Sequence, residues 1–314
     1  MTNPDPATKR VMSTRPNVGT KRPRKRRKGS EGWDFIAPAL LIICVFVVLP
    51  CVWGIVLSFT GFDGILPARF VGAANYRRLA EDPLVRSTLL NTVLYVALTL
   101  PAGLILSLIV ALALNEKWFA GRSVTRGIYF LPNITSLVAV AFVWEWLLNP
   151  EYGLVNAGLR GIGLPGQGWL SNPNLAMPCV AMVAVWHGLG FSVLVYMAGL
   201  RSVPGEVYEA ARIDGAGAWQ QFRHVTWPLL TPTTMFLTMM GVIGGFQVFQ
   251  SVYIMTGGGP LDRTRVYLFY LWQTGFQNLE MGYASALAVL LFVIVLCLTL
   301  VQWRFFNRRM STWQ

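Results

Sequence analysis

Residues 202–228 read SVPGEVYEAARIDGAGAWQQFRHVTWP and separate two long apolar segments. The first part of this stretch has a short apolar face at helical spacing, formed by Val207, Ala210 and Ala211. Gly215 then predicts a break, because glycine adopts a positive φ without a Cβ clash. The bulky side chains that follow share one side of a second short segment: Trp219, Phe222 and Val225. We therefore predict two short helices joined at Gly215, although periodicity alone fits an amphipathic hairpin on a membrane surface equally well.

Six long apolar segments surround this stretch, at about 35–60, 87–114, 127–148, 176–200, 229–255 and 283–306. Each is long enough to cross a membrane, because one spanning helix needs roughly 20 apolar residues. Hydrophobic residues make up 54% of the chain and charged residues only 13%, whereas a soluble domain is about 25% charged. Tryptophans near the segment ends are typical of interfacial anchors. The sequence therefore predicts an all-α, polytopic membrane protein with six transmembrane helices.

A basic arm precedes the first apolar segment. Ten of the 26 Lys and Arg residues lie before position 30, where Asp5 is the single acid. The run KRPRKRRK at 21–28 could bind nucleic acid or act as a nuclear address, but an apolar segment follows at once. We interpret residues 1–30 as a disordered cytoplasmic arm near the anionic inner leaflet, ahead of one membrane domain at 31–314. The arm predicts a cytoplasmic N-terminus, with residues 201–228 on the same side.

Motifs for several kinds of chemistry are missing from the sequence. No G-x-x-x-x-G-K-[ST] occurs, so the chain has no P-loop of its own for ATP. The two histidines, His187 and His224, lie on different segments, and the four cysteines form no C-x-x-C pair, so no metal site is predicted. No G-x-S-x-G nucleophile elbow or other catalytic cluster is visible. We therefore expect no enzymatic activity in this chain, and energy for active transport must come from a partner or an ion gradient.

Polar side chains inside the predicted spans are candidates for a solute path, because such groups are costly in a membrane and tend to face the bundle interior. His187 lies mid-span, and Gln247, Gln250 and Tyr253 lie three residues apart on one side of the fifth segment. Helix packing is the alternative for each: His187 can bond a neighbouring carbonyl, and the glutamines can join helices. Glu145, between two tryptophans, is interpreted as an interfacial anchor.

The stretch EAARIDGAGAWQQFRHVTWPLL, from Glu209 to Leu230, resembles the EAA loop of the permeases of binding-protein-dependent ABC importers. The matching positions are Glu209, Ala210, Ala211, Asp214, Gly215, Ala216, Phe222 and Pro228. The resemblance extends from about Phe35 to Arg309. It includes several further motifs, among them Asn91-Thr92, LPN at 131–133, WEWLLNPEYGLVN at 144–156 and TGGGP at 256–260. These motifs are similar to those of the carbohydrate-uptake branch, which includes the maltose and glycerol-phosphate permeases.

The resemblance implies a type I permease fold in the cytoplasmic (inner) membrane and import of a sugar or sugar-like solute. The implied partners are a second homologous permease subunit, two ABC ATPase subunits that bind ATP and Mg²⁺, and an extracytoplasmic solute-binding protein. The EAA-type loop would dock on an ATPase through six coupling residues: Glu209, Ala210, Ala211, Asp214, Gly215 and Phe222. The alternatives are the same importer class for glycerol phosphate, a phosphodiester or a polyol, and an ion-coupled carrier. The carrier is less favoured, because Glu145 is the one acid within the predicted spans.

By the same resemblance, the sugar-contacting positions of the maltose permease fall on Asn133, Leu137, Ala184, His187, Gly188, Phe191, Gly241, Gly245 and Val248. Most of these residues differ from that relative, so the location of a site is implied and the solute is not. The predicted solute path comprises Asn133, His187, Gly188, Phe191, Gly241, Gly245, Gln247 and Gln250. Gly241 and Gly245 also form a G-x-x-x-G pattern, which more often serves helix packing.

Overall fold

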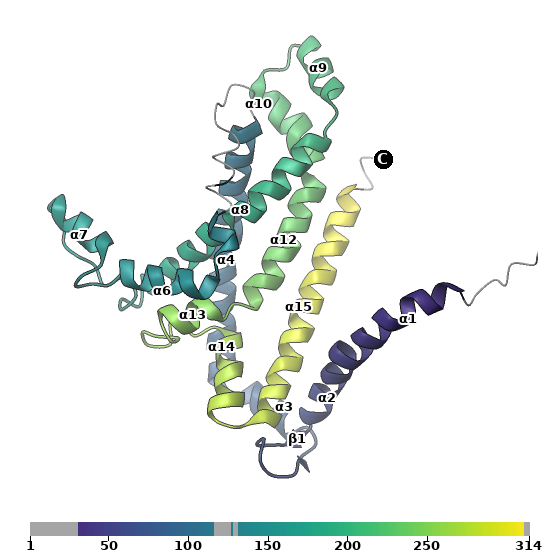
Figure 1. Ribbon diagram of the computed structural model, residues 1–314, viewed down its shortest axis with the longest axis vertical. Coiled ribbons are helices and arrows are strands. Elements are labelled where there is room, and N and C mark those ends of the chain that lie inside the picture. The colour runs from purple at the N-terminus through teal and green to yellow at the C-terminus, as the bar shows by residue number, and fades with distance from the viewer. Residues whose placement is uncertain (1–30, 116–126, 128–130, 311–314) are drawn as a thin grey trace, which may run out of the picture. The chain divides into compact units, whose positions relative to one another are not determined.

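The computed structural model describes residues 31–115, 127 and 131–310, and within them the chain is mostly helical (Figure 1). Contacts divide the chain into two compact units, residues 1–50 and 51–314. The predicted basic arm at 1–30 lies outside the described residues, and so does the loop at 116–126.

The described part of the first unit is an apolar helical run. It comprises α1 (Glu31–Ile43), the π-helical η1 (Cys44–Val48) and the first residues of α2 (Leu49–Leu57). The side chains from position 36 to position 50 are all exposed, and Ile36–Leu57 is long and apolar enough to cross a membrane. A helix that is apolar on every face is stable in a nonpolar environment and not in water. This helix therefore fits the first predicted span, at 35–60.

Four long helices form the body of the second unit: α4 (Pro83–Asn115), α8 (Ala176–Ser202), α12 (Thr231–Phe246) and α15 (Met281–Met310). The most extensive contacts are those of α4 with α8 and with α12. Glycines allow α12 to approach α4 closely: a methyl group on Gly241 would lie 2.5 Å from Leu100 Cδ1, and one on Gly245 would lie 2.6 Å from Val96 Cγ2. The packing interpretation of this G-x-x-x-G pair therefore agrees with the structure.

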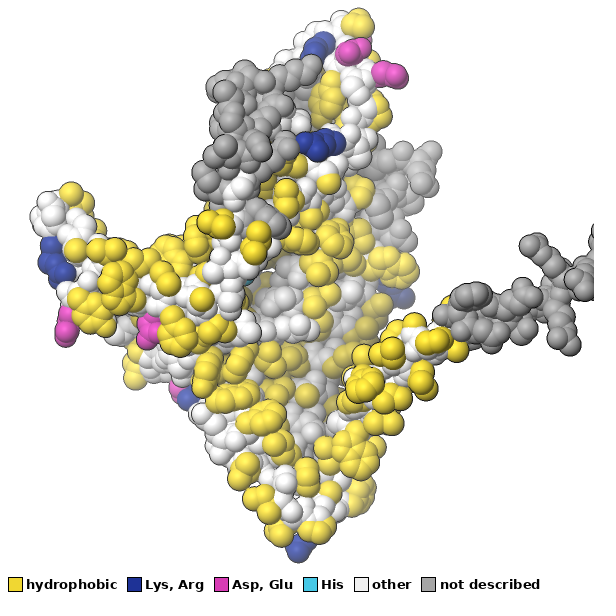
Figure 2. Space-filling model, viewed as in Figure 1, with side chains coloured by type: hydrophobic (Ala, Val, Ile, Leu, Met, Phe, Trp, Pro, Cys, Tyr) yellow, Lys and Arg dark blue, Asp and Glu magenta, His cyan; other side chains and the backbone are white. Residues whose placement is uncertain are grey.

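Shorter elements occupy the two ends of this body and its side. One end carries the antiparallel pair β1 (Thr60–Gly61) and β2 (Arg69–Phe70), followed by α3 (Ala74–Glu81). The opposite end carries α9 (Gly205–Ile213) and α10 (Ala218–Gln221), as Figure 1 shows. In the face shown in Figure 2, charged side chains gather around α9 and around α6 (Leu137–Leu147) and α7 (Leu154–Gly161), and they are sparse along the long helices. This distribution is the one expected for a body embedded in a membrane.

The remaining elements complete the second unit: α6 (Leu137–Leu147), α7 (Leu154–Gly161), η2 (Phe222–Thr226), α11 (Trp227–Leu229), α13 (Gln250–Met255), α14 (Tyr267–Trp272) and η3 (Gln273–Gln277). Fully buried Asn156, on α7, closes the loop from α6 to α8. Its Oδ1 accepts from the Gln167 amide (3.0 Å) and from Trp169 Nε1 (2.9 Å). Its Nδ2 donates to the carbonyls of Gln167 (2.8 Å) and Pro150 (3.1 Å). The paired amide thus connects Pro150, before α7, to Gln167 and Trp169, after it.

Among the described residues, four helices are long and apolar enough to span a membrane: Ile36–Leu57, Pro83–Asn115, Ala176–Ser202 and Met281–Phe306. A fifth results if Ala218–Leu229 and Thr231–Phe246, which are bent by 61°, form one span. The predicted segment 127–148 is broken, because Ser136 has an extended ψ of 128° between the helical residues 131–134 and α6. The described residues therefore give four or five spans, and the predicted number of six is not confirmed.

The predicted segment 229–255 is also broken. Helix α12 ends at Phe246, where the amides of Gln247 and Val248 bond to carbonyls only three residues back. The carbonyls belong to Gly244 and Gly245, and glycine lowers the stability of a helix interior. Gln247 therefore ends α12, whereas Gln250 begins α13. The prediction that Gln247, Gln250 and Tyr253 share one side of a continuous helix is wrong.

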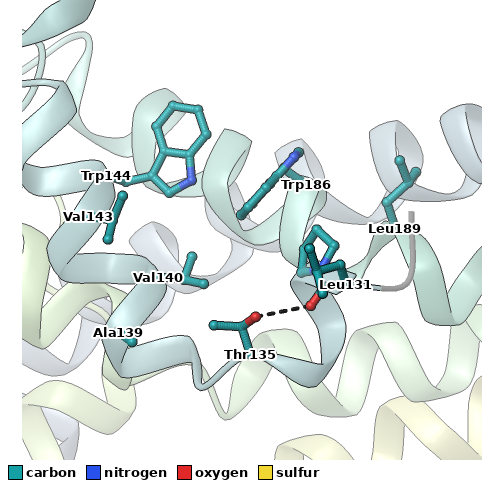
Figure 3. A pocket seen from close by; sticks show the side chains of 9 residues that line it. Leu131, Thr135, Ala139, Val140, Val143, Trp144, Trp186 and Leu189 are labelled. Atoms are coloured by element: carbon teal, nitrogen blue, oxygen red, sulfur yellow. Dashed lines mark hydrogen bonds between the residues drawn. The ribbon is translucent and has the colours of Figure 1, made fainter. Parts of the chain in front are cut away.

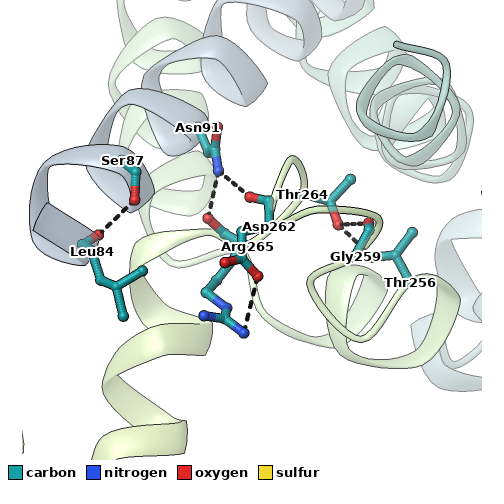
Figure 4. A network of polar contacts seen from close by, with 8 residues as sticks. All are labelled: Leu84, Ser87, Asn91, Thr256, Gly259, Asp262, Thr264 and Arg265. Atoms are coloured by element: carbon teal, nitrogen blue, oxygen red, sulfur yellow. Dashed lines mark hydrogen bonds and ion pairs between the residues drawn. The ribbon is translucent and has the colours of Figure 1, made fainter. Parts of the chain in front are cut away.

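Two of the motifs quoted for the resemblance meet in a polar network (Figure 4). Asn91, on α4, donates through Nδ2 to the carbonyls of Asp262 (2.8 Å) and Arg265 (2.9 Å). The Thr264 hydroxyl donates to the carbonyl of Gly259 (2.6 Å) and bonds to the Thr256 hydroxyl (2.7 Å). Thr264 thus holds the TGGGP residues, and α4 holds the residues that follow them, Asp262 and Arg265.

Candidate functional site

The stretch from 202 to 228 forms the predicted pair of short helices joined at a glycine. Gly215 has a φ of +79° and directly follows the C-cap of α9. Its amide donates to the Arg212 carbonyl (3.0 Å), and the Ala216 amide donates to the Ala211 carbonyl (2.9 Å). These two bonds form a Schellman cap, which needs a left-handed residue at Gly215. The prediction of a break at Gly215 is confirmed.

The six predicted coupling residues differ in exposure. Glu209, Ala210, Asp214 and Gly215 are exposed, and Ala211 is half-buried. Phe222 instead faces the helical body: it packs against the buried residues of α4 and α8 and stacks on Trp219 at 5.5 Å between ring centroids. It anchors the loop and does not present a surface.

Four exposed large apolar side chains of this loop were not among the predicted coupling residues: Val207, Ile213, Trp219 and Trp227, of which Ile213 and Trp219 are the most exposed. Ile213 is 86% exposed and Trp219 is 69% exposed. Large apolar side chains at a polar end of a molecule often mark a contact with a partner. A search for bulky apolar residues within this otherwise polar and alanine-rich loop would have found them.

Two adjoining cavities lie between α4, α8 and α12, with volumes of about 420 and 370 Å³. Both are lined by Tyr95, Ala184, His187 and Gly244. Six of the eight predicted solute-path residues line one or both of them: His187, Gly188, Gly241, Gly245, Gln247 and Gln250. The break between α12 and α13 thus places both glutamines on the first cavity, although they lie on different helices.

Two predicted solute-path residues do not line these cavities. Asn133 is half-buried in the helical residues before the break at Ser136, and Phe191 is 41% exposed on α8. Tyr95 lines both cavities and was missed by the sequence reasoning. Its signal was a polar hydroxyl in the middle of the second apolar segment.

The cavity walls offer hydrogen-bonding groups that the described residues leave free. His187 Nε2 lies 3.1 Å from the Thr135 carbonyl, which can only accept, so in the neutral imidazole Nε2 carries the proton and Nδ1 is an acceptor. The alternative predicted for His187, a hydrogen bond to a neighbouring carbonyl, is therefore observed at Nε2. Nδ1 is not used in this bond. The side-chain amides of Gln247 and Gln250 make no hydrogen bond to any other described residue. Together these groups supply both donors and acceptors to a neutral polar solute.

An apolar pocket of about 480 Å³ lies beside these cavities (Figure 3). Trp144 and Trp186 form part of its wall in an edge-to-face pair with centroids 5.7 Å apart. The polar groups of this wall are the Thr135 hydroxyl, which bonds to the Leu131 carbonyl, and the indole N–H groups of the two tryptophans. This wall therefore has fewer polar side chains than the walls of the two cavities. Glu145, the predicted interfacial anchor, is exposed and is not part of the pocket wall.

A charged network joins α3, α14 and α15 at the end that carries β1. Asp82 accepts hydrogen bonds from the hydroxyls of Tyr270 and Tyr283. Arg78 lies 4.1 Å above the Tyr283 ring and pairs with Glu280 at 2.9 Å. Burial raises the pKa of Asp82, but the hydrogen bonds from the two tyrosines and from the Leu84 amide outweigh it, so the pKa lies below its usual value.

Residues 85–312 match the family described as binding-protein-dependent transport system inner membrane component. The chain therefore belongs to this family of membrane-embedded permease subunits. It is 36% identical over 280 residues to the probable ABC transporter permease protein YurN of Bacillus subtilis, covering 87% of this chain and 94% of YurN. It is 34% identical over 271 residues to the sulfoquinovosyl glycerol transport system permease protein SmoG of Agrobacterium fabrum, covering 86% and 88%.

A solved structure agrees with these relatives. A bacterial ABC transporter that imports the acidic polysaccharide alginate contains a chain that superposes with a TM-score of 0.77 at 25% identity. The superposition covers 88% of this chain and 94% of that one. The fold is therefore that of an ABC importer permease, and the chain is a transport subunit in a membrane and not an enzyme.

Proposed function

We propose that this chain is the permease subunit through which a sugar or sugar-like solute enters the cytoplasm. The observation that carries the proposal is the pair of cavities, where His187, Gln247 and Gln250 present free polar groups inside an apolar helical body. Uncharged donors and acceptors of this kind suit hydroxyl groups. The names of relatives support the solute class, since they include permeases for sulfoquinovosyl glycerol, arabinooligosaccharides and lactose.

The charges of the cavity walls separate this proposal from its alternatives. No Lys or Arg is among the described residues that line the two cavities, so a phosphate group has no cationic partner there. This observation disfavours glycerol phosphate and phosphodiesters. No Asp or Glu is among those lining residues either, whereas ion-coupled carriers use intramembrane acids. A polyol remains compatible with the walls.

ATP-driven transport by this chain requires partners. We infer that two ATPase subunits hold ATP and Mg²⁺, that a second homologous permease completes the path, and that a solute-binding protein delivers the solute. The relative that imports alginate has a structure in complex with an alginate pentasaccharide-bound periplasmic protein, which supports the last of these partners. In this arrangement the chain has six spans and a cytoplasmic N-terminus, and the basic arm at 1–30 lies near the inner leaflet.

The loop at 201–228 is the proposed contact with an ATPase. Its exposed helix α9 offers Glu209, Ala210 and Asp214, and Ile213 and Trp219 add apolar area beside them. Exposed apolar side chains surrounded by polar ones are typical of a protein interface.

The test of the proposed function is uptake by the complete complex in proteoliposomes, with radiolabelled lactose, glycerol and glycerol 3-phosphate as probes. We expect ATP-dependent uptake of the sugar, and no ATP hydrolysis by this chain reconstituted alone. Gln250→Ala should raise the KM for the transported solute, whereas the matched control Gln277→Ala, an exposed amide outside both cavities, should leave it unchanged. Uptake of glycerol 3-phosphate in place of the sugar, or ATP-driven uptake by the isolated chain, would contradict the proposal.

A further inference from the structure

Helix α9 is attached to the helical body by very few contacts. Most of its residues are exposed, and Tyr208 and Ala211 are half-buried. Of the α9 side chains, all of which are described, Tyr208 is the one that hydrogen-bonds to another element: its hydroxyl lies 3.0 Å from Thr226 Oγ1. The covalent connection through Gly215 is a turn with no atom within 4 Å of the position a Cβ would take. Apart from its two covalent connections, at Val203–Pro204 to α8 and at Gly215 to α10, α9 can therefore pass a displacement to the body through the Tyr208 hydroxyl.

The far partner of this bond is fixed in the body. Thr226 is 5% exposed and is the last residue of η2. Its hydroxyl lies 3.4 Å from the Gln221 carbonyl and donates to it, so Tyr208 is the donor to Thr226. The Thr226 carbonyl accepts from the amide of Leu230 (2.9 Å), which is fully buried against α4 and α8. The Tyr208–Thr226 hydrogen bond thus connects α9 to the residues directly before α12.

Helix α12 carries the cavity wall. It begins at Thr231, directly after Leu230, and it ends at Phe246, just before Gln247. A segment that is packed in two discrete arrangements can carry a displacement from one of its ends to the other. A movement of α9 that displaces Thr226 therefore acts on α12, the helix that lines both cavities.

From this geometry we infer that the Tyr208–Thr226 hydrogen bond passes movements of α9 to α12, and that both are positioning residues for transport. The inference rests on the proposed role of the loop as the ATPase contact. It assigns a function to a tyrosine that precedes the matched positions, which begin at Glu209.

The experiment measures transmission without needing the solute. In the complete complex, with the four native cysteines replaced by alanine, Gln247→Cys reports on the cavity through its rate of labelling by N-ethylmaleimide. The rate is compared with and without ATP and vanadate. Tyr208→Phe and Thr226→Val each remove one hydroxyl with little change of shape. Matched controls are Tyr152→Phe, an exposed tyrosine remote from the loop, and Thr238→Val, whose hydroxyl bonds to the Thr234 carbonyl within α12 at 2.7 Å.

We expect each test variant to reduce the ATP-dependent change in labelling by about three- to tenfold, the range for loss of one hydrogen bond. The double variant should lose no more than the larger single loss, because both substitutions remove the same bond. Co-purification of the ATPase should be retained, and both controls should behave as the parent does.

Three results would overturn the inference. The first is parental behaviour of Tyr208→Phe, the second is loss of the ATPase from that variant, and the third is a double variant whose loss is the product of the single losses. Failure of the proposed coupling role looks different. In that case Ala210→Arg, on the exposed face of α9, would retain the ATPase, and the parent itself would show no ATP-dependent change in labelling.

Discussion

The turn at Gly215 allows a prediction in which backbone strain is separated from steric bulk. With a φ of +79°, this residue lies in the left-handed region, where an L-residue costs about 1–2 kcal/mol and a β-branched residue more. A methyl group at this position would meet no atom within 4 Å. The whole penalty of Gly215→Ala is therefore conformational, and 1–2 kcal/mol corresponds to about a 5- to 30-fold loss in the population of the capped turn.

The matched control is Gly215→Asn, because asparagine adds a side chain yet tolerates the left-handed region. Solute-stimulated ATPase activity and uptake of the complete complex, normalised to inserted protein, should follow the order Gly, Asn, Ala, Val. Gly215→Val should insert normally but lose the ATPase on purification or hydrolyse ATP independently of solute. The reasoning is refuted if Val couples as well as Gly, or if Asn is as defective as Val, since bulk and not φ would then be limiting.

Three further predictions follow from the polar contacts of the second unit. His187→Ala should lower the rate or affinity of uptake while the ATPase stays bound, whereas unchanged uptake kinetics would leave His187 with a packing role alone. Asn156→Asp should destabilise the complex by about 2–4 kcal/mol, because an amide with both its polar atoms paired is replaced by a buried carboxylate. Thermal unfolding in detergent measures this loss of stability, with Asn174→Asp, at an exposed asparagine, as the control. The pKa of Asp82 in the folded protein lies below its usual 3.8, so the ionised carboxylate stabilises the fold above pH 3.8 and this contribution is lost as pH falls through the folded pKa. Asp82→Asn should remove this acid-dependent step from a pH series of melting temperatures.

The sequence predicted the features that local pattern determines. Apolar length marks the spans at 87–114, 176–200 and 283–306, each of which lies within a continuous helix. The break at Gly215 follows from the conformational freedom of glycine and is found with a positive φ. His187, Gln247 and Gln250 were predicted from their polarity within apolar segments, and the resemblance added Gly188, Gly241 and Gly245. Tertiary packing, which neither argument supplies, brings His187 and Gln250 to one cavity.

The sequence could not predict the breaks within apolar segments. Hydropathy is high on both sides of Ser136 and of Gln247, so a window over these residues reads as one span. In the structure, neighbouring elements surround the helices at these breaks: Val252 and other α13 residues pack among buried side chains of α6 and α8. Irregular backbone at such depth is tolerated only where protein surrounds it, and a linear sequence carries no direct sign of that protection.

The hydrogen bonds from Asn91 to the segment that follows TGGGP have a consequence for the synthesis of the chain. The Asn91 amide bonds to carbonyls that lie 171 and 174 residues later in the chain. A nascent chain therefore carries α4 without these two hydrogen bonds until residue 265 has been synthesised. Chains truncated before that point retain an unpaired polar group in a helix otherwise suited to lipid, which is costly. Premature termination should consequently yield fragments that membrane quality-control proteases degrade, even though most of the spans in them have already been synthesised.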